Sequence, residues 1–506
     1  MAPDASTQVV NGSDHKRWIL YAFSMGCSGH QSPGLYTVPS DKSIFHNKIS
    51  YWTDTAKLLE RGKFDGIFLA DVWGGYDVYN KSLDASLASG AQFPVIDPLM
   101  TISAMASVTK NLSFGITATT SYEHPYALAR RFSTLDHLTN GRVGWNVVTG
   151  YLESAARQFG KANQELHAKR YDVAHEYMDV VYKLWEASWA DNAVQHDIKK
   201  PLYSIPDRVR PINHKGHYYE SVPGPHICEP SLQRTPVIFQ AGSSGPGLAF
   251  AGKHAEVMFI AAHNPSVARS RVEAARNAAK NAGRDPASLK VLALLCPIVA
   301  ATDEEARAKH EYLLRHGSDE GALALFGGWT GIDLGPFSDD EELRNLPEGN
   351  AIKSAVEGFA QQDPSVQKWT KRAVADQIKV GGLGPVVVGS PTSVADQLES
   401  WISDAHVDGF NLAYATSPGT FIDFIELVLP ELQRRGHVWH DYPAPGPLPE
   451  NWPTTKKFEG APRGFGEDED IGLTCREKLY GPGQRRLRED HYGSRFKWNS
   501  FHSSST

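Results

Sequence analysis

The amino-acid sequence predicts an α/β protein built as a (βα)8 TIM barrel with insertions. Short apolar segments rich in β-branched and aromatic residues recur along the chain, each followed by a segment of helical periodicity, and there are eight such units. The apolar segments are hydrophobic on both faces, as expected for parallel strands covered by helices. No Gly-x-Gly-x-x-Gly follows the first segment, which argues against an open doubly wound sheet.

The first four units begin with strands predicted at 18–23, 65–71, 113–120 and 142–149. The helix after the first strand is predicted over Ile49–Arg61, because Gly62 is a typical helix terminator. The next helix is expected near 99–110. Pro125 opens the third helix, since proline is favoured at the first helical position. After the fourth strand we expect a long helix over 171–189.

The last four units begin with strands predicted at 236–242, 256–262, 291–300 and 408–414. Helices are expected to follow from Ser243 or Ser244, from Pro265, from Asp303 and over 421–435. A large insertion, about 317–392, separates the seventh unit from a helix at 393–404 and the eighth strand. We therefore assign residues 1–436 to one barrel domain. Residues 437–506 form a partly irregular C-terminal extension, whose Pro, Gly and charged residues predict that it wraps the surface.

Composition and charge exclude several classes of function. The chain has 51 basic and 58 acidic residues, a formal charge of −7, and no concentrated basic stretch of the kind that nucleic-acid binding needs. The four cysteines lie far apart, which argues against a disulfide framework. The N-terminal segment lacks the apolar run of a signal peptide, and no stretch approaches 18 apolar residues. We expect a cytoplasmic protein with no membrane or nucleic-acid partner.

Polar residues at the ends of predicted strands are candidates for chemistry, because the active site of a (βα)8 barrel lies at the carboxyl ends of its strands. Gly242-Ser-Ser-Gly245 stands between a strand and a helix. Its backbone N–H groups, two hydroxyls and positive helix end suit a phosphate monoester. The alternative is that Ser243 or Ser244 only caps the helix, and the sequence favours neither interpretation.

Asp71 ends the second strand, and Asn146 interrupts the apolar fourth strand. The carboxylate can hydrogen-bond a polyol or a ring N–H, or it can cap the next turn. The buried amide must find partners, either within the core or at the edge of a flat cofactor. His167 and Tyr171 are four residues apart, so one helical face presents both rings, for which surface packing is the more frequent outcome.

His214 and His217 form a His-x-x-His pair near Cys228. A zinc site usually has a third firm ligand in a recognisable context, which this segment lacks. We therefore expect no metal site.

Several stretches keep the same order along about 18–435 as those of one known family. They are Phe64-Asp-Gly-Ile-Phe-Leu-Ala-Asp71, Ala129-Arg-Arg-Phe-Ser-Thr-Leu-Asp-His-Leu138 with Gly141-Arg-Val-Gly-Trp-Asn-Val-Val-Thr149, Arg170-Tyr171 with Lys183-Leu-Trp185, His217-Tyr218, Gln240-Ala-Gly-Ser-Ser244 and Asp408-Gly-Phe-Asn-Leu412. Together they resemble the luciferase-like flavin-dependent monooxygenases, in the group of nitrilotriacetate monooxygenase and dibenzothiophene-sulfone monooxygenase.

The resemblance implies that FMN lies at the carboxyl-end mouth of a bacterial-luciferase-like barrel. The cofactor-binding residues it implies are Asp71, Thr117, Asn146, His167, Tyr171, Ser243 and Ser244. It favours a cofactor role for the His167 and Tyr171 pair and a phosphate role for the two serines. As catalytic residues for proton transfer we expect His30, after the first strand, or His124; a structural role as a buried histidine is the alternative for each.

The implied activity is that of a two-component FMN-dependent monooxygenase. Reduced FMN (FMNH2), supplied by a separate NAD(P)H:flavin reductase, and O2 would oxygenate a small organic substrate. A homodimer or homotetramer is also expected. Two alternatives stay open, namely an F420-dependent or other flavin oxidoreductase of the same superfamily and a non-catalytic flavin-binding barrel. The insertion is expected to cover the mouth and form much of the substrate pocket, so the sequence does not identify the substrate.

Overall fold

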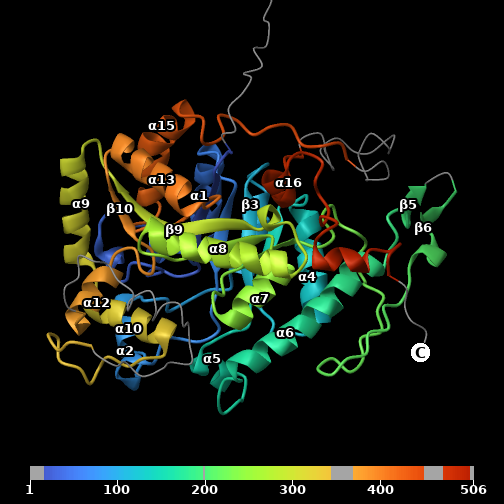
Figure 1. The fold of residues 1–506 in the computed structure, drawn as a ribbon, viewed down its shortest axis with the longest axis horizontal. Helices are drawn as coiled ribbons and strands as arrows, with labels where there is room; N and C mark the ends of the chain where they lie inside the picture. The colour runs from blue at the N-terminus through green and yellow to red at the C-terminus, as the bar shows by residue number, and fades with distance from the viewer. Residues whose placement is uncertain (1–15, 198–199, 344–368, 449–470, 502–506) are drawn as a thin grey trace, which may run out of the picture.

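Eight parallel strands close into a barrel in the computed structural model, which describes residues 16–197, 200–343, 369–448 and 471–501. In barrel order the strands are β1 (Ile19–Met25), β2 (Gly66–Ala70), β3 (Ser113–Thr119), β4 (Val143–Val148), β7 (Val237–Gln240), β8 (Val257–Ile260), β9 (Lys290–Val299) and β11 (Gly409–Leu412). β11 pairs with both β1 and β9, and the pairing of β8 with β9 completes the ring. The predicted (βα)8 barrel is confirmed (Figure 1).

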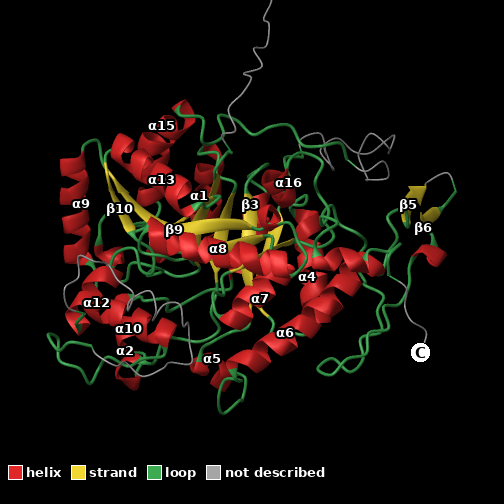
Figure 2. Ribbon diagram, viewed as in Figure 1, coloured by secondary structure: helices red, strands yellow, loops and turns green. Residues whose placement is uncertain are grey.

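Helices connect the strands and cover the outside of the barrel (Figure 2). They are α1 (Ile49–Arg61), α2 (Asp84–Ser89), α3 (Ile102–Ala106), α4 (Pro125–Leu138), α5 (Glu153–Gln158), α6 (His167–Tyr182), α7 (Gly245–His254), α8 (Pro265–Asn281), α9 (Asp303–His316), α13 (Pro391–Ala405), α14 (Gly419–Asp423) and α15 (Leu429–Arg434). The side chains of Asn264 and Thr302 cap α8 and α9. In the described ranges, no helix is both long and apolar enough to span a bilayer.

Some predicted helices are shorter than expected. The helix expected near 99–110 consists of a 3-10 turn, Pro98–Thr101, and the short α3. Turns follow it, and the carboxylate of Glu60 then accepts three consecutive backbone N–H groups, from Lys110 to Leu112, just before β3. An antiparallel pair of strands that the sequence did not predict, β5 (Val194–Asp197) and β6 (Leu202–Ser204), lies outside the barrel.

A layer of aromatic side chains fills the barrel interior. Tyr21, Phe68, Phe239 and Phe259 have ring centroids 4.2 to 6.4 Å apart. A glycine makes room for one of these rings, since a Cβ at Gly144 would lie 2.2 Å from a ring carbon of Phe239. The barrel is therefore a packed core and not a pore.

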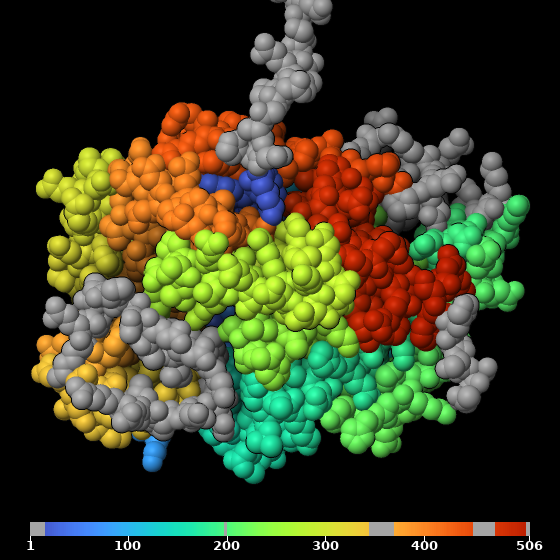
Figure 3. All heavy atoms as spheres, viewed as in Figure 1, coloured from blue at the N-terminus to red at the C-terminus, as the bar shows by residue number. Residues whose placement is uncertain are grey.

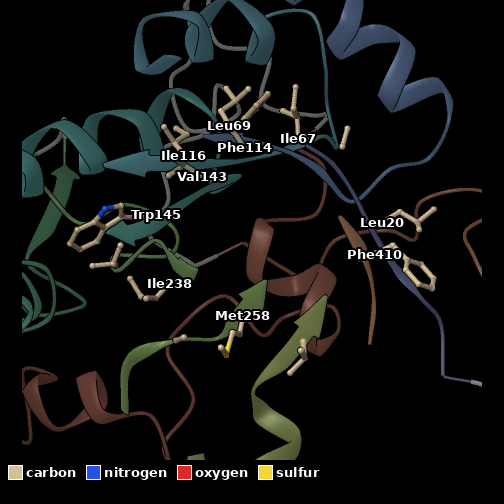
Figure 4. Packing of buried hydrophobic residues seen from close by; sticks show 14 of the residues in the cluster. Leu20, Ile67, Leu69, Phe114, Ile116, Val143, Trp145, Ile238, Met258 and Phe410 are labelled. Carbon is tan, nitrogen blue, oxygen red and sulfur yellow. The ribbon is translucent and has the colours of Figure 1, made fainter. Parts of the chain in front are cut away.

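A larger apolar core lies between the strands and the surrounding helices (Figure 4). Strand residues that face it include Leu20, Ile67, Phe114, Trp145, Ile238, Met258 and Phe410. The strands thus bury both faces, as their largely apolar sequences predict.

The insertion packs with the segment after β2 and with α5 in a second apolar core. Its helices α10 (Asp319–Thr330) and α12 (Lys371–Ile378) pack together, and α10 packs on α2. The chain then forms β10 (Val386–Gly389), which pairs in parallel with the last four residues of β9 outside the closed ring. Part of the predicted insertion, 344–368, lies outside the described residues.

Helix α16 (Cys475–Tyr480) lies against the amino ends of the barrel strands. Cys475 and Leu479 pack with the interior aromatic layer, and Lys478 donates to the carbonyl oxygen of Asp65 (2.8 Å). The guanidinium of Arg476 lies 2.8 Å from the carboxylate of Glu256, and both side chains are buried. The expectation that the extension wraps the surface is wrong for this helix, because its charged residues are paired inside the protein. Residues after it do reach the surface beside α8 (Figure 3).

The buried ion pair between Arg476 and Glu256 gives a test of this arrangement. Arg476→Met leaves the Glu256 carboxylate buried without its partner, and breaking such a pair typically costs about 3–5 kcal/mol of unfolding free energy. Urea denaturation should show a correspondingly lower midpoint. Arg434→Met, which breaks an exposed ion pair to Glu431, should leave the midpoint nearly unchanged. Equal midpoints for the two variants would contradict the anchoring role of α16.

Candidate active site

A cavity of about 210 Å³ opens at the carboxyl ends of the barrel strands; we call it the first cavity. Phe68 and Phe259 of the aromatic layer form part of its floor, and Trp329 and Leu383 of the insertion form part of its roof. The sequence-predicted residues that line it are His30, Asp71, Thr117, Asn146 and Ser243. Side chains from five different strand ends therefore meet in one space.

A second cavity, of about 190 Å³, adjoins the first. The two share the lining residues Val148, Tyr151, Ala241 and Ser243. The sequence-predicted residues that line the second cavity are His167, Tyr171, Ser243 and Ser244. The two cavities thus form one elongated site that runs from the apolar barrel mouth to the amino end of α7.

Two amide side chains present oxygen atoms to the first cavity. The Asn146 amide nitrogen donates to the hydroxyl of Thr117 (2.9 Å), and its oxygen is buried with no hydrogen-bond partner among the described residues. The same is true of the oxygen of Asn411 on β11. A buried carbonyl oxygen without a donor indicates that a ligand N–H or O–H belongs there. Asn411 was not singled out from the sequence, although it is a polar residue in an apolar strand, the signal that identified Asn146.

Asp71 stands at the rim of the first cavity, directly after β2. Burial, together with the nearby Asp97 carboxylate, raises the pKa of Asp71 to about 7. The group therefore changes between a neutral acid, which donates a hydrogen bond, and a carboxylate, which only accepts, near neutral pH.

The second cavity ends at the first turn of α7. The Ser244 hydroxyl accepts the N–H of Gly247 (3.2 Å), so the capping interpretation holds for this serine. The same hydroxyl lies 3.3 Å from Nε2 of His167, and Tyr171 is buried beside it, not packed on the surface. A Cβ at Gly242 would lie 2.5 Å from the Tyr171 hydroxyl. The backbone thus approaches these side chains closely, at a helix end that favours an anion.

Arg170 adds a positive charge to the second cavity that the sequence analysis did not assign. Its side chain is 5% exposed, and its Nε has no hydrogen-bond partner within the described part of the chain. Burial lowers its pKa from the ordinary arginine value, yet a guanidinium remains charged at neutral pH. The one signal in the sequence was its place next to Tyr171. Arginines in a helix with many charged residues are usually exposed, so this signal was weak.

The two predicted catalytic histidines lie in different surroundings. His30 is 1% exposed, lines the first cavity and packs edge-on against Phe23. Neither of its ring nitrogens has a hydrogen-bond partner among the residues described. Burial lowers the pKa of His30 to about 3, so its imidazole is neutral. His124 caps α4 through its own ring nitrogen, which accepts the N–H of Tyr126 (3.2 Å), and it lines neither cavity.

No group of three or more His, Cys, Asp or Glu side chains is placed to hold a metal ion in the described segments. His214 instead lies 3.3 Å from the carboxylate of Glu176, and that carboxylate also accepts the backbone N–H of His217 (3.0 Å).

Comparison with known proteins identifies close relatives. Dimethyl-sulfide monooxygenase of Hyphomicrobium sulfonivorans is 50% identical over 433 residues, which cover 86% of this chain and 89% of that protein. The resemblance seen in the sequence is confirmed as well. Nitrilotriacetate monooxygenase component A of Aminobacter aminovorans is 34% identical over 81% of this chain and 91% of its own length. Dibenzothiophene-sulfone monooxygenase of Rhodococcus erythropolis is 35% identical over 78% and 87%.

Solved structures agree with these relatives. The crystal structure of DmoA from Hyphomicrobium sulfonivorans superposes with a TM-score of 0.84 at 46% identity, covering 96% of each chain. A riboflavin lyase (RcaE) with modified FMN and riboflavin superposes with a TM-score of 0.80 at 32% identity, covering 95% of this chain and all of that one. The family model described as luciferase-like monooxygenase matches residues 22–408. The chain therefore belongs to the luciferase-like monooxygenase family and is a flavin-dependent monooxygenase.

Proposed function

We propose that this protein is the oxygenating component of a two-component FMN-dependent monooxygenase. It would take reduced FMN from a separate NAD(P)H:flavin reductase and use O2 to oxygenate a small organic substrate. The observation that carries the proposal is the joining of the two cavities, one apolar with an aromatic floor and one ending at a helix amino end and a buried arginine. A flat ring linked to a phosphate monoester has this shape and charge distribution. The relative solved with modified FMN supports it.

The second cavity would hold the phosphate. Arg170 would supply charge, and the hydroxyls of Ser243, Ser244 and Tyr171 would supply hydrogen bonds, assisted by the positive end of α7. His167, 3.3 Å from the Ser244 hydroxyl, would orient that group.

The first cavity would hold the ring. Asn146 and Asn411 offer acceptor oxygens, the Thr117 hydroxyl fixes the orientation of the Asn146 amide, and Asp71 stands where it can accept a ring N–H. When bound, reduced FMN supplies the two electrons that reduce O2, one oxygen atom entering the substrate and the other leaving as water. The protein's part is to exclude water, to orient the substrate and to move protons.

His30 is our proposed proton-transfer residue. Its neutral imidazole has one N–H donor and one acceptor nitrogen, and both are available inside the cavity. The capping role of His124 makes it the weaker of the two predicted candidates.

The proposed activity can be tested directly. The purified chain, FMN, NADH and a generic flavin reductase are incubated under oxygen-18 gas with a panel of uncharged and charged organic substrates. We expect mass spectrometry to find one labelled oxygen atom in a product only when all components are present. Tight binding of reduced FMN without any labelled product across the panel would favour the non-catalytic barrel, and hydride exchange with a deazaflavin would favour the F420-dependent alternative.

Arg170→Met tests the phosphate assignment. Loss of a charged hydrogen-bonding group should weaken FMN binding by about tenfold to a hundredfold. It should leave the binding of riboflavin, which lacks the phosphate, unchanged, as measured by fluorescence titration. Arg130→Met, on the exposed face of α4, is the matched control. An equal loss for both ligands would mean that Arg170 supports the fold and not the phosphate.

The raised pKa of Asp71 predicts a pH-dependent affinity. Below about pH 7 the carboxyl group is protonated, so a ring N–H exchanges a charged acceptor for a weaker neutral one, and riboflavin affinity should fall by up to about tenfold per pH unit. Above pH 7 the carboxylate is present and the affinity should level off. Riboflavin is used because it has no titrating phosphate. In Asp71→Asn the profile should be flat between pH 5 and 8, and a profile like that of the wild type would assign the titration to another group.

Comparing His30→Phe with His124→Asn decides between the two histidines. His30→Phe should lower kcat by about a hundredfold or more, the usual contribution of acid–base catalysis, with FMN affinity unchanged. His124→Asn keeps a side chain able to cap α4 and should show the smaller loss. The reverse order of losses, measured by product formation, would transfer the proton-transfer role to His124.

A further inference from the structure

Trp329, at the end of α10, forms part of the roof of the first cavity and is 3% exposed. Two glycines precede it and allow the helix to lie directly on the loop that follows β2. A Cβ at Gly328 would lie 2.3 Å from the ring of Tyr76, and one at Gly327 would lie 3.2 Å from the backbone nitrogen of Tyr79. This close packing fixes the indole over the aromatic floor.

A hydrogen bond supports the roof. The hydroxyl of Tyr76, whose ring packs against Gly328, lies 2.7 Å from the hydroxyl of Tyr151. Both tyrosines line the first cavity, one from the loop after β2 and the other from the loop after β4. Three segments distant in the sequence therefore meet at the roof: the end of α10, the loop after β2 and the loop after β4.

The first cavity has little capacity to hold an anion. Among the residues that the structure describes, its charged lining residues are Asp71 and Arg271. The Arg271 guanidinium donates to the carbonyl oxygen of Ala261, and Asp71 repels a second negative charge once it is ionised. A substrate with two carboxylates would lose its hydration there and meet a single guanidinium, which already donates to a carbonyl oxygen.

We propose that Trp329 sets the upper size limit of the substrate, and that the first cavity selects compact, uncharged molecules over anionic ones. The inference rests on the proposed function and extends it to a substrate class. Part of the 210 Å³ between floor and roof would be filled by the flavin ring, so each added methylene group meets the indole. Divalent sulfur suits this lining, because it makes favourable contacts with aromatic rings such as Phe23, Phe68 and Phe259.

The test uses FMN-loaded protein and the probe series dimethyl, diethyl and dipropyl sulfide, together with thiodiacetate, a thioether with a carboxylate on each arm. Product formation gives kcat/KM, and isothermal titration in the absence of reductant gives the affinity. The variants are Trp329→Ala, which removes the roof, and Trp329→Phe, which keeps an aromatic ring but loses the N–H. Leu325→Ala is the matched control, since Leu325 is buried on the same helix and lines neither cavity.

For the wild type we expect kcat/KM and affinity to fall by about tenfold or more from dimethyl to dipropyl sulfide, and thiodiacetate to be neither bound nor oxidised. Trp329→Ala should reverse the size preference by about tenfold or more, whereas Trp329→Phe and Leu325→Ala should keep it within about twofold. An unchanged preference in Trp329→Ala, or turnover of thiodiacetate by the wild type, would overturn the inference. Failure of the proposed function is a different result, namely bound sulfides with no labelled oxygen in any product.

Discussion

The closure of eight parallel strands around one aromatic layer is the constraint on which the other features of this protein depend. Phe239 can occupy the barrel centre only because Gly144 has no side chain, and the layer so formed blocks the interior. Above it the strand ends carry the polar residues of the site. Below it α16 fills the remaining space with Cys475 and Leu479. One packed layer therefore separates the half of the barrel that can bind ligands from the half that stabilises the fold.

Much of the fold was predictable because local and tertiary requirements agree in the barrel strands. The run at β8, Val-Met-Phe-Ile, is apolar throughout, and a parallel strand between a packed interior and a helix layer requires that. The helix end before β3 was less predictable, because the groups that bind the chain there, such as Glu60 at Lys110, are distant in the sequence. The burial of α16 was not predictable from its sequence, because a charged residue such as Arg476 is usually exposed. Its partner, Glu256, is distant in the chain, and only the tertiary structure brings the two together.

The site was predictable to the extent that polar residues in apolar strands are conspicuous. Asn146 and Asp71 were found in this way, and Asn411 carried the same signal. Arg170 was not found, because a charged residue in an amphipathic helix is ordinarily exposed and only the tertiary packing turns this one inward. The insertion was expected to cover the mouth of the barrel, but no local pattern singled out Trp329 as one of its residues that line the first cavity. The residues that we propose for cofactor binding were thus easier to predict than the residue that we propose limits the size of the substrate.

The pairing of β10 with β9 bears on how such a protein can diversify. The first part of β9 belongs to the closed ring, and its last four residues hold β10, so one strand joins the barrel to the inserted segment. These contacts are backbone hydrogen bonds, which depend little on side-chain identity. Loop closure also becomes only slightly less favourable as an insertion lengthens. The segment between α9 and β10 can therefore change in length and sequence while the eight-stranded ring to which it is attached keeps its structure.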